Sequence, residues 1–524
     1  MGVPRRQGVL GAILSLFGLL ALASCGGTPA TTGGDSGTGI GPVLGFGSVS
    51  GSVTVIVNGV SYTVDNTAFV DAHGRTLDNL AVGMWVKATG SSIDDNPTSP
   101  TGVAGRVEVL RLVDGPMDDN SVSFDNNSFR VMGQTVFVGL TTVFDNVADL
   151  SAIDNLARQG KRPEFEIHGT TDDTGFLRAG FVHLWSDNLV AGREVQIRGT
   201  VANLNRTDNT FTVGPRLQKV VYTSAASVPA GLGNGAYLEA RGTYRVSDNT
   251  IVAGSLDLED PASGQKAGDL AKAEGYVNRV LSDIGLTKRF ELIAPDGLQV
   301  VNWSTGTTAF RDGAASDVAP GAKVQVEGSR NQDKTLAAKR ISFRKPSNIR
   351  IESTVKGKTS STITILGKTV TVNLLTSYKD STGTFPGSFG LGDIHVGING
   401  NTVRVDAFLD ASAVVARVVA SRVELLDPDP VPLNRHILLA TVGSKSLPFF
   451  TILGVQVQTF SDVRTSYLQL DGAEFPQGRL QPFSQQTNFF DAIAAGATIV
   501  RARGTYSASS MDANEVQIQP RLDK

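Results

Sequence analysis

The sequence predicts an all-β protein made of tandem small five-stranded barrels with an OB-like arrangement, short helical turns and a disordered N-terminal tether. Three observations lead to this fold class. Glycine is abundant, with 58 among 524 residues. A short motif that ends in glycine recurs six times, at intervals of roughly the size of one small domain. The residues around each copy alternate between apolar and polar, which is the periodicity of a strand with one buried face.

Each repeat opens with a strand and a hairpin. A Gly or Thr beside Val begins the unit, and strands such as Phe211–Val213 and Ile363–Ile365 follow. The dipeptides Asp208-Asn209 and Asp248-Asn249 are typical of hairpin turns, because both side chains can bond their own backbone.

A second motif, Thr-x-aromatic-x-Asp, follows the hairpin. The four full copies are Thr67–Asp71, Thr308–Asp312, Thr376–Asp380 and Thr487–Asp491. A short helical turn is expected after it, and unit two has the longest. There Ser151 and Asp154 form a capping box, and Gly160 ends the turn. Because Asp is a preferred N-cap, we interpret the recurring Asp as structural, against the alternative of a ligand or an acid.

The glycine motif reads apolar, any residue, apolar or small, any residue, Gly. Its copies are Val86–Gly90, Phe165–Gly169, Leu238–Gly242, Val324–Gly328, Val396–Gly400 and Val500–Gly504. We expect the Gly at a sharp turn that a side chain would obstruct. A returning strand with a small residue follows it. Its copies are 103–107, 177–181, 251–256, 336–341, 414–416 and 511–516. Five strands in about 75 residues favour a small closed barrel, which also removes exposed sheet edges.

These motifs divide the chain into a signal segment, a tether and six repeats, each expected to have its own core. The boundaries are 1–24 for the signal peptide, 25–44 for the tether, and 45–112, 115–187, 193–260, 271–345, 350–426 and 436–521 for the repeats. The last interval between glycine motifs is the longest, so we expect an insertion around 425–480.

The N-terminus predicts a lipid anchor at Cys25, the single cysteine. Arg5 and Arg6 precede the uncharged apolar run Val9–Ala23, which is too short to span a bilayer and is typical of a signal segment. The ending Leu22-Ala-Ser-Cys resembles the lipobox of bacterial lipoproteins. That resemblance implies removal of 1–24 and lipidation of Cys25. Gly26 in place of Asp implies the outer membrane if the source is Gram-negative. The alternative is an ordinary signal peptide with a stray cysteine.

Residues 26–44 are mostly Gly, Thr, Ser and Pro, which cannot bury enough apolar surface to fold. The repeats that follow resemble the tandem small-barrel repeats of bacterial envelope lipoproteins, a family of uncharacterised function. The family has no assigned catalytic residues, so the resemblance transfers none.

Charge and motif content limit the partners. With 47 cations against 50 anions, the chain lacks the basic footprint of nucleic-acid binding, so no nucleic acid is expected. The five His lack zinc spacing, and no nucleophile motif is present, so no metal, cofactor or catalytic residue is expected. His183 near Trp185 is the one local pairing of a His with an aromatic side chain, and Trp85 and Trp303 are expected to be at least half buried. The expected partners are the membrane, through lipid on Cys25, and an envelope glycan or protein.

Three functions remain open. The first is a membrane-anchored, non-catalytic envelope protein acting as a spacer or binding scaffold. The second is an oligosaccharide-binding barrel protein, which a stripe of exposed aromatic residues on corresponding strands would favour. The third is an envelope enzyme with a site at a repeat interface or in the insertion, which convergent groups with perturbed pKa would favour.

Overall fold

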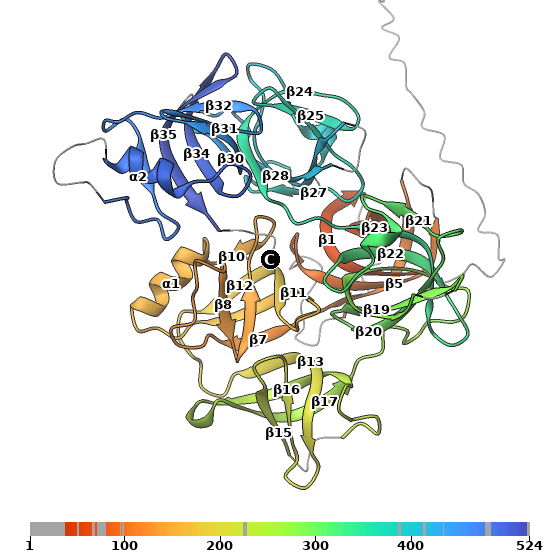
Figure 1. The fold of residues 1–524 in the computed structure, drawn as a ribbon. Coiled ribbons are helices and arrows are strands. Elements are labelled where there is room, and N and C mark those ends of the chain that lie inside the picture. The colour runs from red at the N-terminus through yellow and green to blue at the C-terminus, as the bar shows by residue number, and fades with distance from the viewer. Residues whose placement is uncertain are drawn as a thin grey trace, which may run out of the picture. The chain divides into compact units, whose positions relative to one another are not determined.

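The computed structural model describes residues 37–520, apart from 50–51, 65–68, 71–79, 95, 97–98, 224–227, 284, 386–388, 412–414, 433 and 477–483. The predicted signal segment and Cys25 lie outside this part of the chain. The described part is almost entirely β-structure and forms six barrels, and Figure 1 labels many of their strands and both α-helices. Within it, no helix is both long enough and apolar enough to cross a membrane.

The first three barrels each contain five principal strands. Barrel 1 holds β1 (Gly37–Val49), β2 (Ser52–Val57), β3 (Val60–Val64), β4 (Phe69–Val70), β5 (Trp85–Asp94) and β6 (Thr101–Val109). Barrel 2 holds β7 (Val113–Pro116), β8 (Ser128–Val131), β9 (Gln134–Phe137), β10 (Val143–Asp145), α1 (Leu150–Arg158), β11 (Glu164–Thr171) and β12 (Leu177–Ser186). Barrel 3 holds β13 (Glu194–Asn205), β14 (Thr210–Val213), β15 (Gln218–Tyr222), β16 (Tyr237–Arg245), η2 (Val246–Asp248) and β17 (Thr250–Leu258).

The last three barrels repeat the pattern. Barrel 4 holds β18 (Leu270–Ser282), β19 (Lys288–Ala294), β20 (Gly297–Trp303), β21 (Ala309–Arg311), η3 (Ala315–Asp317), β22 (Lys323–Arg330) and β23 (Leu336–Phe343). Barrel 5 holds β24 (Ile349–Lys358), β25 (Thr362–Ile365), β26 (Lys368–Thr371), β27 (Ser377–Asp380), η4 (Leu391–Asp393), β28 (Thr402–Asp410) and β29 (Arg417–Asp427). Barrel 6 holds β30 (His436–Ser446), β31 (Phe449–Ile452), β32 (Val455–Gln458), β33 (Ser466–Leu468), α2 (Ser484–Ala492), β34 (Ile499–Ser507) and β35 (Ser510–Gln519).

Every barrel closes with the strand order of an OB-fold. In barrel 4 the order is β18-β19-β20-β23-β22 and back to β18, with β20 and β23 parallel and the other neighbours antiparallel. The other five share this order, although in barrel 2 the closure between β7 and β8 is one bridge, Met117 to Val131. The predicted fold class, tandem five-stranded OB-like barrels, is therefore confirmed.

The recurring Thr of the second motif lies just before the short strand and hydrogen bonds to the last strand of its barrel. In barrel 4, Thr308 Oγ1 accepts the backbone N–H of Ser304 at 3.0 Å and donates to the carbonyl of Ala338 at 2.9 Å. Thr142, Thr376 and Thr465 donate to the carbonyls of Ala179, Ala420 and Ala513 in the same way. The motif recurs because one buried hydroxyl satisfies two backbone groups.

The recurring Gly lies inside a strand, at a β-bulge, and not at the sharp turn that was expected. The pairing register of β22 with β23 shifts between Glu327 and Gly328. A Cβ on Gly328 would lie 1.9 Å from the carbonyl oxygen of Ala337. Gly90, Gly169, Gly242 and Gly504 show the same bulge and the same clash, within 2.0–2.1 Å. The glycine therefore lets two strands approach closely.

In unit five the sequence assignment was wrong by several residues. The predicted motif Val396–Gly400 lies in the loop before β28, and the bulge falls between Asp406 and Ala407. The returning strand is β29, so its small residue is Ala420 and not Ala416. The sequence contains Val-Val-Ala twice, at 414–416 and 418–420, and only hydrogen bonding distinguishes the two copies.

Unit six differs in the same way. The predicted Thr487–Asp491 copy lies on helix α2, and the true short strand is β33, which follows Thr465. The additional length lies between β33 and β34, so it extends beyond the expected range 425–480. In unit two, helix α1 begins two residues earlier than predicted, because Asp149 and not Ser151 accepts an N–H, that of Ala152.

The barrels associate in pairs through their first strands. β7 pairs with β13, and β24 pairs with β30, both antiparallel. β1 pairs with β18 in parallel, which joins barrel 1 to barrel 4. Residues 37–44, expected to be part of the tether, are thus strand: β1 is hydrogen bonded to β18 and β5 despite its Gly-rich composition. Each first strand covers an edge that its neighbour's barrel leaves open.

Buried side chains follow the pairing. Val324 and Val326 of the glycine motif are fully buried, as are their counterparts in every barrel. One continuous cluster contains core residues of both barrels 5 and 6, including Val405 and Val500, and another joins barrels 2 and 3. The expectation of one isolated core for each repeat is therefore corrected, since a shared sheet lets two small cores merge.

Candidate functional site

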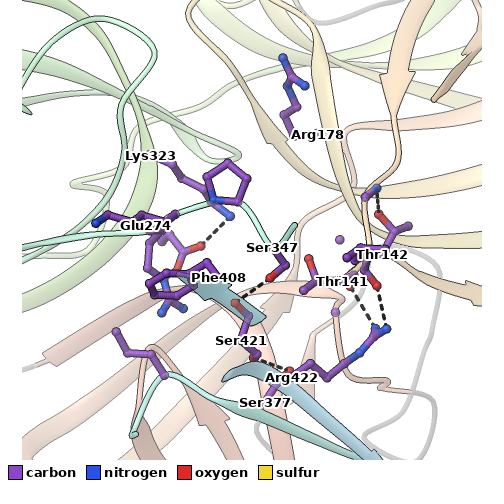
Figure 2. Close-up of a pocket in the computed structure, with 18 of the residues that line it drawn as sticks. Thr141, Thr142, Arg178, Glu274, Lys323, Ser347, Ser377, Phe408, Ser421 and Arg422 are labelled. Atoms are coloured by element: carbon purple, nitrogen blue, oxygen red, sulfur yellow. Dashed lines mark hydrogen bonds and ion pairs between the residues drawn. The ribbon is translucent and has the colours of Figure 1, made fainter. Parts of the chain in front are cut away.

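A cavity of about 430 Å³ lies where residues of barrels 1, 2, 4 and 5 meet. Its lining comes from the loop before β5, the β9–β10 connection and the start of β12, the chain around β22 and β23, and strand β29. Figure 2 shows 18 of the lining residues, ten of them labelled, with the hydrogen bonds and ion pairs among the residues drawn. Among the described lining residues, five are cations, four are carboxylates and none is His or Cys.

One wall of the cavity holds two cations, Lys323 and Arg344, which both pair with Glu274 on β18. The Glu274 side chain is 1% exposed and pairs with Lys323 at 2.9 Å and with Arg344 at 3.0 Å. Burial raises the pKa of the Glu274 carboxyl, but Arg344 and Lys323 together outweigh it and hold the pKa below its ordinary value. The three groups therefore carry one net positive charge. The Lys323 ammonium also lies 5.7 Å from the ring centroid of Trp85.

Hydroxyl groups line another wall. Ser347 donates to Ser421 with an Oγ–Oγ distance of 2.8 Å, and Ser377 donates to the backbone carbonyl of Ser421 at 3.2 Å. Phe408 and Phe343 supply apolar surface to the same cavity. Because the hydroxyls can donate and accept, this wall suits a ligand that carries hydroxyl groups.

Close backbone contact forms part of the floor. A Cβ on Gly83 of barrel 1 would lie 2.5 Å from the carbonyl oxygen of Gly180 in barrel 2, and a Cβ on Gly180 would lie 2.7 Å from that of Gly83. Arg178 beside them pairs with Asp172 at 2.8 Å and covers the ring of Phe137, 4.3 Å from its centroid. The two barrels meet here without room for a side chain.

A lattice of opposite charges lies on the outer face of barrel 5, next to the cavity. Arg350, Asp406 and Arg422 stand directly opposite one another on β24, β28 and β29. The Asp406 carboxylate lies 2.7 Å from Arg350 and 2.8 Å from Arg422. A second row parallel to it holds Glu352, Arg404, Glu424 and Lys379 in the same alternation. Sequence reasoning missed both rows, although charges at alternate positions of β24 and β28 signal them.

The lattice also connects barrel 5 to barrel 2. Arg350 and Arg422 both donate to the backbone carbonyl of Leu140, at 2.8 and 2.9 Å. Arg422 donates as well to the carbonyl of Thr141, at 3.1 Å. Two guanidinium groups share one carboxylate, Asp406, and their remaining donors bind the connection between β9 and β10. Figure 2 shows the hydrogen bonds that Arg422 donates to this connection.

Asp312 lies in the cavity lining and is not the predicted N-cap. The 3-10 helix η3 is capped by Asp317, which accepts the N–H of Ala314 at 2.8 Å. Asp312 has a positive φ of 59°, and its carboxylate lies 3.7 Å from Arg417. Burial and, after it, the neighbouring Asp410 raise the pKa of the Asp312 carboxyl. The expectation failed because the turn begins two residues after Asp312.

The other candidate residues are dispersed. Asp380 accepts the N–H groups of Thr382 and Phe385, which supports its structural interpretation, whereas Asp491 is on α2. Asp71 and His73 lie outside the described residues. His183 binds Asp145 at 2.6 Å beside Trp185, and neither His183 nor Trp185 lines the cavity. Trp85 and Trp303 are 2% and 5% exposed, in agreement with their expected burial.

Comparison with known families gives a match. The model of the family described as "Domain of unknown function (DUF5666)" matches residues 41–108, 120–205, 274–342 and 350–424. These four segments correspond to barrels 1, 2, 4 and 5 and extend into the start of barrel 3. Comparison with curated proteins found no match.

Solved structures that match this chain have low sequence identity and low TM-scores. Drosophila Unr CSD456 is 15% identical, with a TM-score of 0.11, over 44% of this chain and 96% of that one. A multidomain protein with nucleic acid binding domains from Streptococcus pneumoniae TIGR4 is 11% identical, with a TM-score of 0.12, over 43% of this chain and 72% of that one.

The exclusion of nucleic acid from the partners is corrected. It was inferred from net charge alone, which is not sufficient to exclude a class of partner. Net charge averages over the whole surface and does not describe one face.

Proposed function

The chain belongs to the DUF5666 family of domains of unknown function, and from that premise we propose that it is a lipid-anchored, non-catalytic scaffold of the cell envelope. In this proposal the barrels hold a binding site away from the membrane. The site is the cavity at the junction of barrels 1, 2, 4 and 5.

The observation that carries the proposal is that buried carboxylates at the junction are paired with cations. Glu274 is neutralised by Lys323 and Arg344, and Asp406 by Arg350 and Arg422. Charged groups held in this way position barrels and present donors, whereas catalysis needs a nucleophile or base with a free reactive atom. In the described cavity lining Thr174 Oγ1 donates to Asp172 at 2.6 Å, but this carboxylate is already occupied, since it also pairs with Arg178 at 2.8 Å and accepts the backbone N–H groups of Thr174 and Phe176.

The enzyme alternative has less support. Asp312 is a cavity residue whose pKa is raised, which is one mark of a catalytic acid. Its carboxylate pairs with Arg417 at 3.7 Å, and among the described residues no hydroxyl group donates a hydrogen bond to it. The strand-face form of oligosaccharide binding also lacks support: among the described residues with exposed large apolar side chains, Trp185 is the only aromatic.

The anchor part of the proposal rests on the Leu22-Ala-Ser-Cys25 ending and the polar segment after it. Cys25→Ala should move the protein from the membrane fraction to the soluble fraction, because no other cysteine can carry the lipid. Ser36→Ala, in the same polar segment, is the matched control and should stay with the membrane. If Cys25→Ala sediments with membranes as fully as the control, the anchor is refuted.

A further inference from the structure

We propose that the junction cavity binds one acidic sugar ring, a hexuronate-type residue that carries one carboxylate and several hydroxyls. This inference rests on the proposed scaffold function and names the ligand class of its site. Three properties of the cavity select this class: its charge, its hydroxyl wall and its apolar surface. Figure 2 labels Glu274 and Lys323 of the charged group and Ser347, Ser377 and Ser421 of the hydroxyl wall.

The charge selects a monoanion. Lys323 and Arg344 together face a single carboxylate, Glu274, so the group has one positive charge in excess. The side chains of Lys323 and Arg344 are 29% and 18% exposed, so a ligand can reach both. A carboxylate balances this excess, whereas a phosphate dianion would leave one uncompensated negative charge in a partly buried site.

Donors remain available at this wall. Among the described residues, Arg344 uses Nε to bind Glu274, and its two terminal amino groups have no protein partner. A guanidinium presents those groups in a fixed fork that matches a carboxylate. The geometry therefore allows Glu274 and a ligand carboxylate to share Arg344 without displacing each other.

The hydroxyl wall selects a polyol over a simple organic acid. Ser421 accepts the hydrogen bond of Ser347, so the hydrogen of its own hydroxyl can be donated to a ligand oxygen. Asp173, an exposed carboxylate in the cavity lining, can accept from a ligand hydroxyl. A site with both donors and acceptors discriminates in favour of a partner that supplies both.

The apolar surface and the size complete the argument. Phe408 and Phe343 line the cavity with Leu375, and the CH face of a sugar ring packs on such surfaces. A volume of about 430 Å³ lies in the usual range for small-molecule sites, and one ring fits within it. The lining comes from four barrels, so the ligand would contact parts of the chain that are far apart in sequence.

The test uses isothermal titration of the purified full chain with D-glucuronate, D-glucose and inorganic phosphate as separate probes. Glucuronate should bind with a Kd of about 1 mM or tighter, as expected for a ligand of about 13 heavy atoms. Glucose, which lacks the carboxylate, and phosphate, which lacks the ring, should each bind at least about tenfold more weakly. No glucuronate binding, or equal binding of phosphate, would overturn the proposal.

Two variants and a control locate the site. Lys323→Gln should weaken glucuronate binding at least about tenfold, while Arg344 still neutralises Glu274 and maintains the fold. Lys334→Gln is the matched control on the same barrel, with an exposed side chain that binds Asp260 outside the cavity, and should match the wild type. Equal affinities for these two variants would refute the cavity as the site.

Ser421→Ala removes one hydroxyl and keeps the proposal testable if Lys323→Gln unfolds. It should weaken glucuronate binding by about threefold to tenfold, as the loss of one hydrogen bond does. An unchanged affinity would refute the role of the hydroxyl wall. Sugar binding in solution is independent of membrane fractionation, so failure of this inference and failure of the anchor can be told apart.

Discussion

Replacing Glu424 with Gln should destabilise barrels 5 and 6, because this carboxylate is the most heavily paired acid of the charge lattice. It lies 2.7 Å from Lys379, 3.1 Å from Arg404 and 3.7 Å from Arg422, and it accepts the hydroxyl of Ser381 at 2.6 Å. Its side chain is 4% exposed, so water screens these contacts little.

The magnitude follows from proton linkage. Burial raises the pKa of the Glu424 carboxyl, but Arg422, Lys379 and Arg404 together outweigh it and lower the pKa from 4.5 to about 2. A shift of that size corresponds to about 3 kcal/mol of folding stability from the ionised form. This agrees in order of magnitude with the loss of about 3–5 kcal/mol when one partner of a buried ion pair is removed.

The sign of the pH dependence follows from the same shift. Because the folded-state pKa lies below the unfolded one, the unfolded chain binds the proton first as the pH falls. The contribution of Glu424 is complete above about pH 5 and is lost progressively between about pH 5 and pH 2. The Gln variant lacks this titration, so the two proteins should differ at pH 7 and converge near pH 2.

The assay is urea unfolding, followed by far-ultraviolet circular dichroism, of a fragment that contains barrels 5 and 6. These barrels share one sheet and one core, so they should unfold together. Glu474→Gln is the matched control, since Glu474 is exposed and makes no ion pair among the described residues. A Glu424→Gln effect below about 0.5 kcal/mol at pH 7, or parallel pH profiles, would refute the reasoning.

Two further predictions concern the backbone and the cavity. Gly328→Ala should lower the unfolding free energy of the chain by about 1–3 kcal/mol, because its Cβ would lie 1.9 Å from the Ala337 carbonyl oxygen. Gly254→Ala, with no atom within 4 Å of an added Cβ, should change it little, and equal thermal shifts would contradict the bulge argument. Asp312→Asn should leave thermal stability at pH 7 unchanged or raised. Burial and then Asp410 raise the pKa of Asp312 in the folded protein, so ionisation of Asp312 lowers the folding stability as the pH rises through that pKa, and Asn does not ionise. Asp312→Ala should fall below Asn by about 1 kcal/mol, since φ is 59° and Asn tolerates that region better; equal losses for Asn and Ala would contradict it.

The sequence predicts the barrels well, because every repeat must satisfy the same local requirements. The glycine motif places two buried side chains two residues apart and a bulge after them, and Val324, Val326 and Gly328 show this pattern directly. The prediction failed in unit five because Ala407 stands where the other units have Gly. The bulge in barrel 5 accommodates the methyl group of Ala407. Without a Gly at this position, the motif search could not identify the bulge.

The association of the barrels could not be predicted from one sequence. β1 of barrel 1 pairs with β18 of barrel 4, although barrels 2 and 3 lie between the two strands in the sequence. The paired segment of β1 is rich in Gly, which has low strand propensity. This segment is a strand because its backbone is hydrogen bonded to β18 and β5. The local composition cannot indicate hydrogen bonds between segments that are far apart in the sequence. The cavity was missed for the same reason, since Glu274, Ser421 and Gly83 lie in three different repeats.

The first-strand pairing also explains why the small barrels of this chain occur as an array. A single barrel of about 75 residues buries a modest core and leaves part of its first strand without a partner. Pairing β24 with β30 covers both edges at once and merges the two cores. The outer faces of the paired strands then become contact surfaces, where unpaired charges would be costly, and the rows of Arg350 and Arg404 meet that requirement by alternating with acids. The junction cavity takes its lining from four barrels, so no single barrel contains it. A ligand of that cavity would therefore bind only the assembled array, which makes binding a test of assembly as well as of function.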